Sequence, residues 1–215
     1  GKQGYALASA AADRGADVTL VSTSSLPVPE GATLVPVETA RELQAAITTA
    51  VSGADVKFLH SPAMPSAELR KTLLADDDTR ERLELWDRVR DTNLRGPYLL
   101  ARALAPHLRA HGACRIVNIA SVGGLYPASS SIAYSASKGG IAGMTLPIAR
   151  DLARNGIRCM TIAPGIFGTP MMFGMPKETQ DALAASVPFP SRLGTPADYA
   201  KLVKHIVEND MLNGE

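Results

Sequence analysis

The sequence predicts an α/β protein with a Rossmann-like, doubly wound parallel sheet in three layers. Short apolar runs rich in β-branched residues alternate with longer helical segments along most of the chain. Strands that are apolar throughout are typical of a parallel sheet whose two faces are covered by helices. The 215 residues are enough for one domain with a full hydrophobic core. We therefore expect a single Rossmann-like domain over residues 1–215.

The first part of the chain predicts two helices and three strands. The first helix runs from Gly4 to Arg14, and Gly15 follows it as glycine commonly follows a helix C-terminus. Apolar, β-branched runs predict the strands, and apolar residues on one face predict the second helix. The remaining ranges are 16–22 and 33–37 for strands, 39–51 for a helix and 55–59 for a strand.

The second part of the chain continues the alternation. The predicted elements are an amphipathic helix at 81–110, a strand at 115–119, a helix at 133–154, a strand at 158–162 and a helix at 196–208. The chain opens at glycines that normally follow a strand, and it ends at Asn213-Gly214-Glu215, where another strand would be natural. We therefore expect the sheet to lack its first and last strands.

Composition excludes several classes of function. The 22 basic and 21 acidic residues leave a net charge of +1, which offers no strong field for nucleic acid or an anionic membrane. The four histidines are scattered, and Cys114 and Cys159 are far apart, so neither a metal site nor a disulfide framework is indicated. No apolar run could span a bilayer and no signal peptide opens the chain. We expect a cytoplasmic protein with no nucleic acid or membrane partner.

The strongest chemical signal is a tyrosine and a lysine on one helix. Tyr134 and Lys138 are four positions apart, which places the phenol and the ammonium on one helical face. A nearby cation favours the phenolate form, which can exchange a proton with an alcohol or carbonyl oxygen. Ser121 follows a strand, where parallel sheets bind ligands, so its hydroxyl could hold the same oxygen. The alternative is that Tyr134 and Lys138 are an ordinary surface pair.

Residues 83–215 resemble the short-chain dehydrogenase/reductase family, because three motifs occur here in the order in which that family has them. Along the chain they are Asp91-Thr92-Asn93-Leu94-Arg95-Gly96, then Asn118-Ile119-Ala120-Ser121 with Tyr134-Ser135-Ala136-Ser137-Lys138, and then Ala163-Pro164-Gly165-Ile166-Phe167-Gly168-Thr169. The resemblance implies that Ser121 orients the substrate and that Tyr134 is the acid/base. It also implies that Lys138 assists the tyrosine and binds ribose, while Asn93 holds a water that relays protons.

The same resemblance implies a nicotinamide cofactor. Tyr134 and Lys138 would contact it, and the loop that begins with Pro164 and Gly165 would bind the carboxamide through the Ile166 backbone and Thr169. A glycine-rich turn should cradle the pyrophosphate, and Gly4 is the glycine placed for that contact. Ser22 stands where NAD enzymes carry an acidic residue, and no arginine is there for NADP. We expect NAD, with NADP left open.

The last third is similar to one subgroup, the short-chain 3-hydroxyacyl-CoA dehydrogenases. The resemblance rests on residues 143–153, 187–194, 206–209 and 212–215. It implies a 3-hydroxyacyl-CoA or 3-oxoacyl thioester as the small-molecule substrate, and a homo-oligomer, a dimer or tetramer. It also implies a mobile substrate lid, although these side chains could equally be apolar core: Phe167, Met171, Met172, Phe173 and Met175.

Residues 1–60 resemble a different family, the phosphopantothenoylcysteine synthetases, which bind CTP. The similar segments are Gly1–Ala8, Arg14–Ser22 and Val37–Ala40. His60-Ser61-Pro62-Ala63 replaces the dehydrogenases' Asn-Asn-Ala-Gly, and we read His60 as a loop residue. The chain is therefore a mosaic: a natural fusion, a designed chimera or a trimmed fragment. Besides the oxidoreductase, a CTP-dependent ligase-like nucleotide binder and a non-catalytic α/β scaffold stay open.

Overall fold

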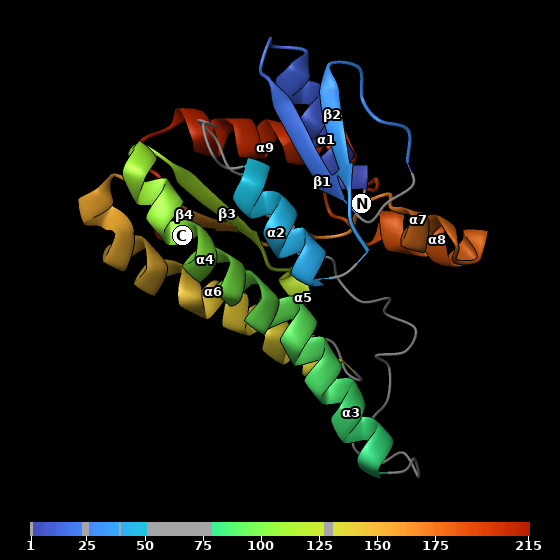
Figure 1. Cartoon of the computed structure of the whole chain (residues 1–215). Helices are drawn as coiled ribbons and strands as arrows, with labels where there is room; N and C mark the ends of the chain where they lie inside the picture. The colour runs from blue at the N-terminus through green and yellow to red at the C-terminus, as the bar shows by residue number, and fades with distance from the viewer. Residues whose placement is uncertain (1, 23–25, 39, 51–78, 127–130) are drawn as a thin grey trace. The chain divides into compact units, whose positions relative to one another are not determined.

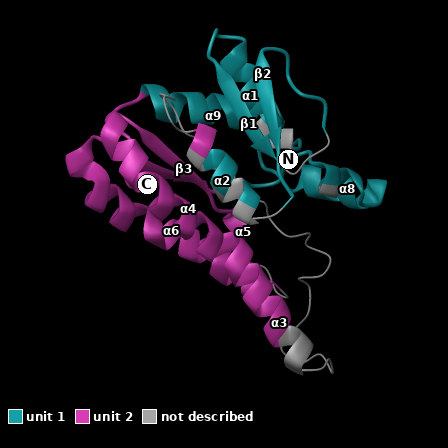
Figure 2. Cartoon of the chain, viewed as in Figure 1, with its two compact units in different colours: residues 1–47, 164–208 teal, residues 48–163, 209–215 magenta. Residues whose placement is uncertain are grey.

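The chain forms two compact units, which are described separately. A computed structural model describes residues 2–22, 26–38, 40–50, 79–126 and 131–215. Unit 1 consists of residues 1–47 and 164–208, and unit 2 consists of residues 48–163 and 209–215 (Figure 2).

The elements of unit 1 include a pair of parallel strands. They are α1 (Lys2–Ala12), β1 (Val18–Ser22), β2 (Ala32–Pro36), α7 (Pro170–Phe173), α8 (Lys177–Ala185) and α9 (Pro196–Glu208), and α2 (Ala40–Ala50) begins in this unit (Figure 1). In the β1–β2 register, Val18 lies opposite Ala32 and Ser22 opposite Pro36. Helix α1 packs against these strands and against α9.

The core of unit 1 follows helical spacing. Tyr5 and Ala8 of α1 are buried, and so are the α9 residues that recur at intervals of three or four: Tyr199, Ala200, Val203 and Ile206. Gly15 ends the turn after α1 with φ of 79°, a conformation that costs residues with a Cβ more than it costs glycine. The predicted glycine stop is therefore confirmed.

Unit 2 is built on the second pair of parallel strands. Its elements are α3 (Thr79–Arg90), the π-helix η1 (Asp91–Arg95), α4 (Gly96–His111), β3 (Arg115–Ile119), α5 (Val122–Leu125), α6 (Ile132–Leu152), the 3₁₀ turn η2 (Ala153–Asn155) and β4 (Arg158–Ile162). Arg115 pairs with Arg158 and Ile119 with Ile162. Helix α6 packs against both strands, whose central residues are buried, as expected for strands covered by helices.

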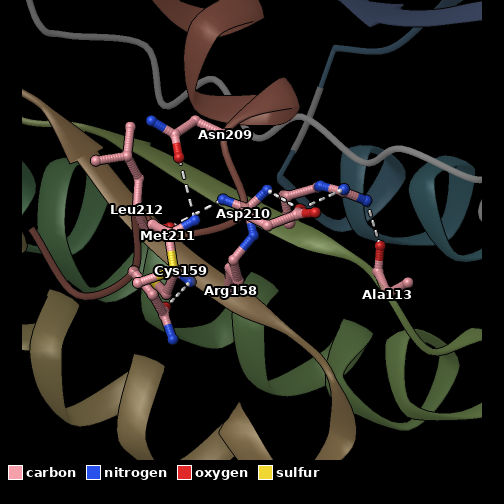
Figure 3. Close-up of polar contacts among 9 residues, drawn as sticks. Ala113, Arg158, Cys159, Asn209, Asp210, Met211 and Leu212 are labelled. Atoms are coloured by element: carbon pink, nitrogen blue, oxygen red, sulfur yellow. Dashed lines mark hydrogen bonds and ion pairs between the residues drawn. The ribbon is translucent and has the colours of Figure 1, made fainter.

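The last residues of the chain lie along β4. The Gly214 N–H donates to the Cys159 carbonyl at 2.8 Å, and the Thr161 N–H donates to the Glu215 carbonyl at 2.7 Å. Arg158 donates to the Leu212 carbonyl at 2.9 Å, and its guanidinium meets the Asp210 carboxylate (Figure 3). The segment 209–215 therefore adds backbone hydrogen bonds to the edge of β4, the strand that carries the buried side chains Cys159 and Met160.

The structure confirms most predicted elements, corrects one of them and adds three short helices. The strands at 115–119 and 158–162 and the helix at 196–208 have the predicted bounds. The helix predicted at 81–110 is instead two α-helices joined by the π-helix η1, and no hydrophobic period signals that change. The sequence missed α5, α7 and α8, of which two are single turns too short for a period to show. The predicted strand at 55–59 and His60 lie outside the described residues.

The described residues contain neither a membrane-spanning helix nor a metal-binding cluster. In the part of the chain that the structure describes, no helix has the length and apolar character needed to cross a membrane. Within the same residues, no three His, Cys, Asp or Glu side chains come together in a way that could hold a metal ion.

Gly124 lets the backbones of α5 and α6 touch. A Cβ built at this position would lie 2.6 Å from the Lys138 carbonyl carbon and 2.7 Å from the Gly139 nitrogen. These neighbours are backbone atoms in the middle of a long helix, so they cannot rotate away as a side chain could. Only glycine allows this approach, which places α5 directly over the helix turn that carries Lys138.

We expect Gly124→Ala to destabilise the protein by about 1–3 kcal/mol, the usual result of overpacking a rigid contact. Urea unfolding, followed by far-UV circular dichroism, measures the change. Gly143→Ala is the matched control, because it adds the same methyl group to α6 where no atom lies within 4 Å. Equal stability of the two variants would show that α5 and α6 do not pack in this way.

Candidate active site

Ser121 and Tyr134 face each other across Gly123. Ser121 follows β3 and caps α5, where its Oγ accepts a hydrogen bond from the Gly123 N–H at 3.1 Å. Because Oγ acts there as an acceptor, the hydroxyl hydrogen is left to donate to a ligand. A Cβ built at Gly123 would lie 3.4 Å from Tyr134 Cε1 and 3.5 Å from Ser121 Oγ. The fold thus brings together two of the residues that the sequence predicted to share one substrate oxygen.

Lys138 is a buried cation one helical turn after Tyr134. Its side chain is only 1% exposed, and its Nζ donates to the Ile119 carbonyl at 2.9 Å. An ammonium has three N–H donors, and the other two have no partner among the residues described. Burial disfavours the charged form and lowers the pKa of Lys138 from 10.5 to about 8. The ammonium therefore remains mostly protonated at pH 7 and keeps a positive charge beside the end of β3.

Asn93 reaches the same helix from the π-helix η1. It is fully buried, and its Nδ2 donates to Ser137 Oγ at 3.2 Å. Ser137 Oγ in turn donates to the Tyr134 carbonyl at 2.7 Å, so a chain of hydrogen bonds joins Asn93 to the backbone of the tyrosine. The Asn93 Oδ1 is buried without a protein partner in the described part of the chain. It is an acceptor available to a bound water, because a buried polar atom without a partner is unfavourable.

The sequence missed Ser137 and η1. Ser137 was part of the predicted motif but had no role, and its contact with Asn93 joins residues 44 positions apart. The signal that could have indicated η1 is functional rather than periodic, because π-helices occur frequently at functional sites. Ser121, Tyr134, Lys138 and Asn93 all belong to unit 2. Gly123 lies between Ser121 and Tyr134, Ser137 links Asn93 to the Tyr134 backbone, and Lys138 follows Tyr134 by one turn of α6.

The other predicted cofactor residues belong to unit 1. Gly4 lies in the first turn of α1, where helix N–H groups lack partners within the helix and can bind anions. Ser22 is the last residue of β1, and its carbonyl accepts from the Val37 N–H at 3.1 Å.

The loop from Pro164 to Thr169 presents donors. Thr169 caps α7, and its Oγ1 accepts from the Met172 N–H at 3.3 Å, which leaves the hydroxyl hydrogen to donate. The Ile166 carbonyl accepts from the Gly194 N–H at 2.9 Å. The Ile166 N–H has no acceptor among the described residues. Two donors of this loop can therefore serve a carboxamide.

The residues expected in a lid differ in burial. Met172 is buried, whereas Phe173 is 54% exposed on the same short helix α7. The structure says nothing of the Met171 side chain.

Helix α4 has a buried face and an exposed apolar residue. Leu104 is buried, while Leu99 is exposed.

Two protein families match different parts of the chain. The family described as "short chain dehydrogenase" matches residues 74–180, which include Ser121, Tyr134, Lys138 and Asn93. The family described as "DNA/pantothenate metabolism flavoprotein C-terminal domain" matches residues 1–63. This division agrees with the predicted difference between the two parts of the sequence.

Curated relatives of the chain carry two printed names, both of 3-hydroxyacyl-CoA dehydrogenases. The "3-hydroxyacyl-CoA dehydrogenase type-2" of Homo sapiens is 53% identical over 139 residues, 62% of this chain and 53% of the relative. The protein of the same name from Drosophila melanogaster is 41% identical over 187 residues, 84% of this chain and 73% of the relative. The "(3R)-3-hydroxyacyl-CoA dehydrogenase" of Rattus norvegicus is 38% identical over 128 residues, 59% of this chain and 49% of the relative. The match thus spans about half the length of the human relative.

A solved structure resembles the chain. The crystal structure of the 3-hydroxyacyl-CoA dehydrogenase type-2 from Mycobacterium avium has a TM-score of 0.85 and 26% identity, and covers 99% of this chain and 88% of its own. With the two parallel strand pairs, this similarity confirms the predicted Rossmann-like α/β fold.

We expect Lys138→Met to remove a pH-dependent part of the stability. The pKa of Lys138 is about 8 in the folded protein and near 10.5 when the chain unfolds. Between these pH values the unfolded chain binds more protons, so the wild type gains stability as pH rises, whereas the variant lacks this gain. Any stability that Lys138→Met gains over the wild type below pH 8 should therefore shrink as the pH rises toward 10.5.

Urea unfolding of both proteins from pH 7 to pH 10.5 measures this difference. Lys201→Met is the control, because Lys201 is exposed on α9 and its loss should change stability equally at each pH. A wild-type-minus-Lys138→Met difference that is constant across the range would contradict a buried ammonium.

Proposed function

Because the chain belongs to the short-chain dehydrogenase family, we propose that it is an NAD(P)-dependent oxidoreductase that acts on a secondary alcohol or ketone. The observation that carries the proposal is the buried Lys138 ammonium one turn from Tyr134, with the Ser121 hydroxyl across Gly123. A phenol, a cation and a hydroxyl donor are the groups that proton exchange at a substrate oxygen requires.

Each residue of unit 2 has a part in this chemistry. Ser121 donates its hydroxyl hydrogen to the substrate oxygen and so fixes its position. Tyr134 gives or takes the proton at its phenolic oxygen, and Lys138 supplies a positive charge one helical turn away on α6. Asn93 holds a water through Oδ1, because that buried acceptor has no protein partner among the described residues. Ser137 keeps the Asn93 amide oriented.

The donors described above fit a nicotinamide cofactor. The cofactor, when bound, accepts or supplies the hydride. The two N–H groups of Lys138 without a partner suit ribose hydroxyls, and the Ile166 N–H and Thr169 hydroxyl suit the carboxamide. Gly4, in the first turn of α1, suits the pyrophosphate. We propose NAD because the 3-hydroxyacyl-CoA subgroup that the sequence resembles uses it. Ser22 selects neither NAD nor NADP by charge.

The substrate that we propose is a 3-hydroxyacyl-CoA or the corresponding 3-oxoacyl thioester. The printed names of the human, fly and rat relatives support this class of substrate. We also propose that the chain acts as one Rossmann-like domain and as a homo-oligomer. Exposed apolar side chains on α4 and α6, such as Leu99 and Leu146, are compatible with association.

One observation favours a second candidate function. Residues 1–63 match a family of pantothenate metabolism, so a ligase-like nucleotide binder remains a distinct proposal for this part of the chain. The two proposals differ in ligand. Saturable binding of CTP by a protein that does not bind NADH would favour the ligase-like reading over the oxidoreductase.

We expect Tyr134→Phe to lower turnover by roughly 10²–10⁴-fold, the usual contribution of general acid–base catalysis. The assay follows oxidation of NADH with acetoacetyl-CoA by purified protein, and fluorescence titration shows whether NADH still binds. Tyr98→Phe is the control, because Tyr98 is an exposed tyrosine on α4. Unchanged turnover in Tyr134→Phe would rule out the proposed mechanism.

A further inference from the structure

We propose that Gly194 and Phe167 form a strap that holds the loop 164–169 in shape for the cofactor, and that position 194 must be glycine for this reason. The inference rests on the proposed function, because it assigns the loop to the nicotinamide carboxamide. All of the residues involved belong to unit 1.

Two backbone hydrogen bonds hold the loop on both sides of Phe167. The Gly194 N–H donates to the Ile166 carbonyl at 2.9 Å, and the Gly168 N–H donates to the Gly194 carbonyl at 2.9 Å. Phe167 and Gly194 thereby form an isolated parallel β-bridge outside the named strands. One residue, Gly194, therefore fixes the backbone on each side of Phe167.

The Phe167 ring occupies the place where any other residue at 194 would carry its Cβ. A Cβ built on Gly194 would lie 2.7 Å from Phe167 Cε1, 2.8 Å from Cδ1 and 2.9 Å from Cζ. Separations below 3.0 Å require something to move. Gly194 does not have the positive φ that would itself require glycine. The reason for glycine at this position is therefore the contact with the ring.

Tyr199 limits where the Phe167 ring can go. The two rings meet edge to face, with centroids 6.3 Å apart and planes at 84°. Tyr199 is itself 1% exposed in α9, so it is held by the core of unit 1. A ring that is displaced from Gly194 meets this packing, and the displacement is passed to the backbone of residues 166–168.

The strap determines the position of the two proposed carboxamide donors. The Ile166 carbonyl accepts a hydrogen bond from Gly194. Thr169 directly follows Gly168, whose N–H donates to the Gly194 carbonyl. Donors held in place before binding lose little freedom when the cofactor arrives. Phe167, Gly194 and Tyr199 are thus positioning residues, since they act through Ile166 and Thr169 without contacting the cofactor themselves.

A double-mutant cycle tests the strap. We expect Gly194→Ala to raise the Kd for NADH about tenfold while the KM for acetoacetyl-CoA stays within about twofold. When Phe167→Ala is also present, the added methyl meets no ring, so the same change at 194 should alter the Kd by less than about twofold. Gly143→Ala, which adds a methyl group in open space on α6, is the control and should leave both constants unchanged.

The outcomes separate this inference from the proposed function. A wild-type protein that binds no NADH overturns the proposed function. If the wild type binds NADH, an unchanged Kd in Gly194→Ala overturns the strap, and so does an equal effect with and without the Phe167 ring. If Gly194→Ala does not fold, Phe167→Leu replaces it. That variant keeps glycine at 194 but loosens the ring contact, so an unchanged Kd for NADH would count against the strap.

Discussion

The rest of the site depends on an ammonium group held out of water. Burying the Lys138 charge is unfavourable, as its lowered pKa shows, and a single protein carbonyl, that of Ile119, meets it among the described residues. An arrangement of this kind is favourable only if the charge interacts with a further group, and the proposed function assigns that role to the bound cofactor. The site is therefore organised around an unbalanced charge, and such perturbed groups cluster at functional sites.

Close contacts through glycine place the functional groups. Gly123 separates the Ser121 hydroxyl from the Tyr134 ring, and Gly124 lets α5 touch the turn of α6 that carries Lys138. In unit 1, Gly194 allows a close contact with the loop that begins at Pro164. There a ring, rather than a helix backbone, occupies the position that a Cβ would take. At Gly124 and Gly194 an added Cβ would lie less than 3.0 Å from its neighbours, so a methyl group there would force a helix backbone or a ring to move.

The N-terminal part of the chain and the rest of it match different protein families. Residues 1–63 match a family of pantothenate metabolism, whereas residues 74–180 match the short-chain dehydrogenases and contain all four proposed catalytic residues. Both parts use the same physical solution, a pair of parallel strands with a helix packed on it. The phosphate contact proposed at the first turn of α1 suits a member of either family, because helix N–H groups bind anions whatever the family.

The sequence by itself predicted the alternation of strands and helices and the parallel pairing, and its resemblance to the short-chain dehydrogenases supplied the four proposed site residues. The alternation follows from local periodicity, and the Tyr134–Lys138 pair follows from a spacing of one helical turn. Only the tertiary structure showed the π-helix that turns Asn93 inward, the Ser137 link between Asn93 and Tyr134, and the Phe167–Gly194 contact. These contacts join residues far apart in the chain, or depend on a single missing Cβ. Neither leaves a periodic signal in the sequence, because packing between elements decides them.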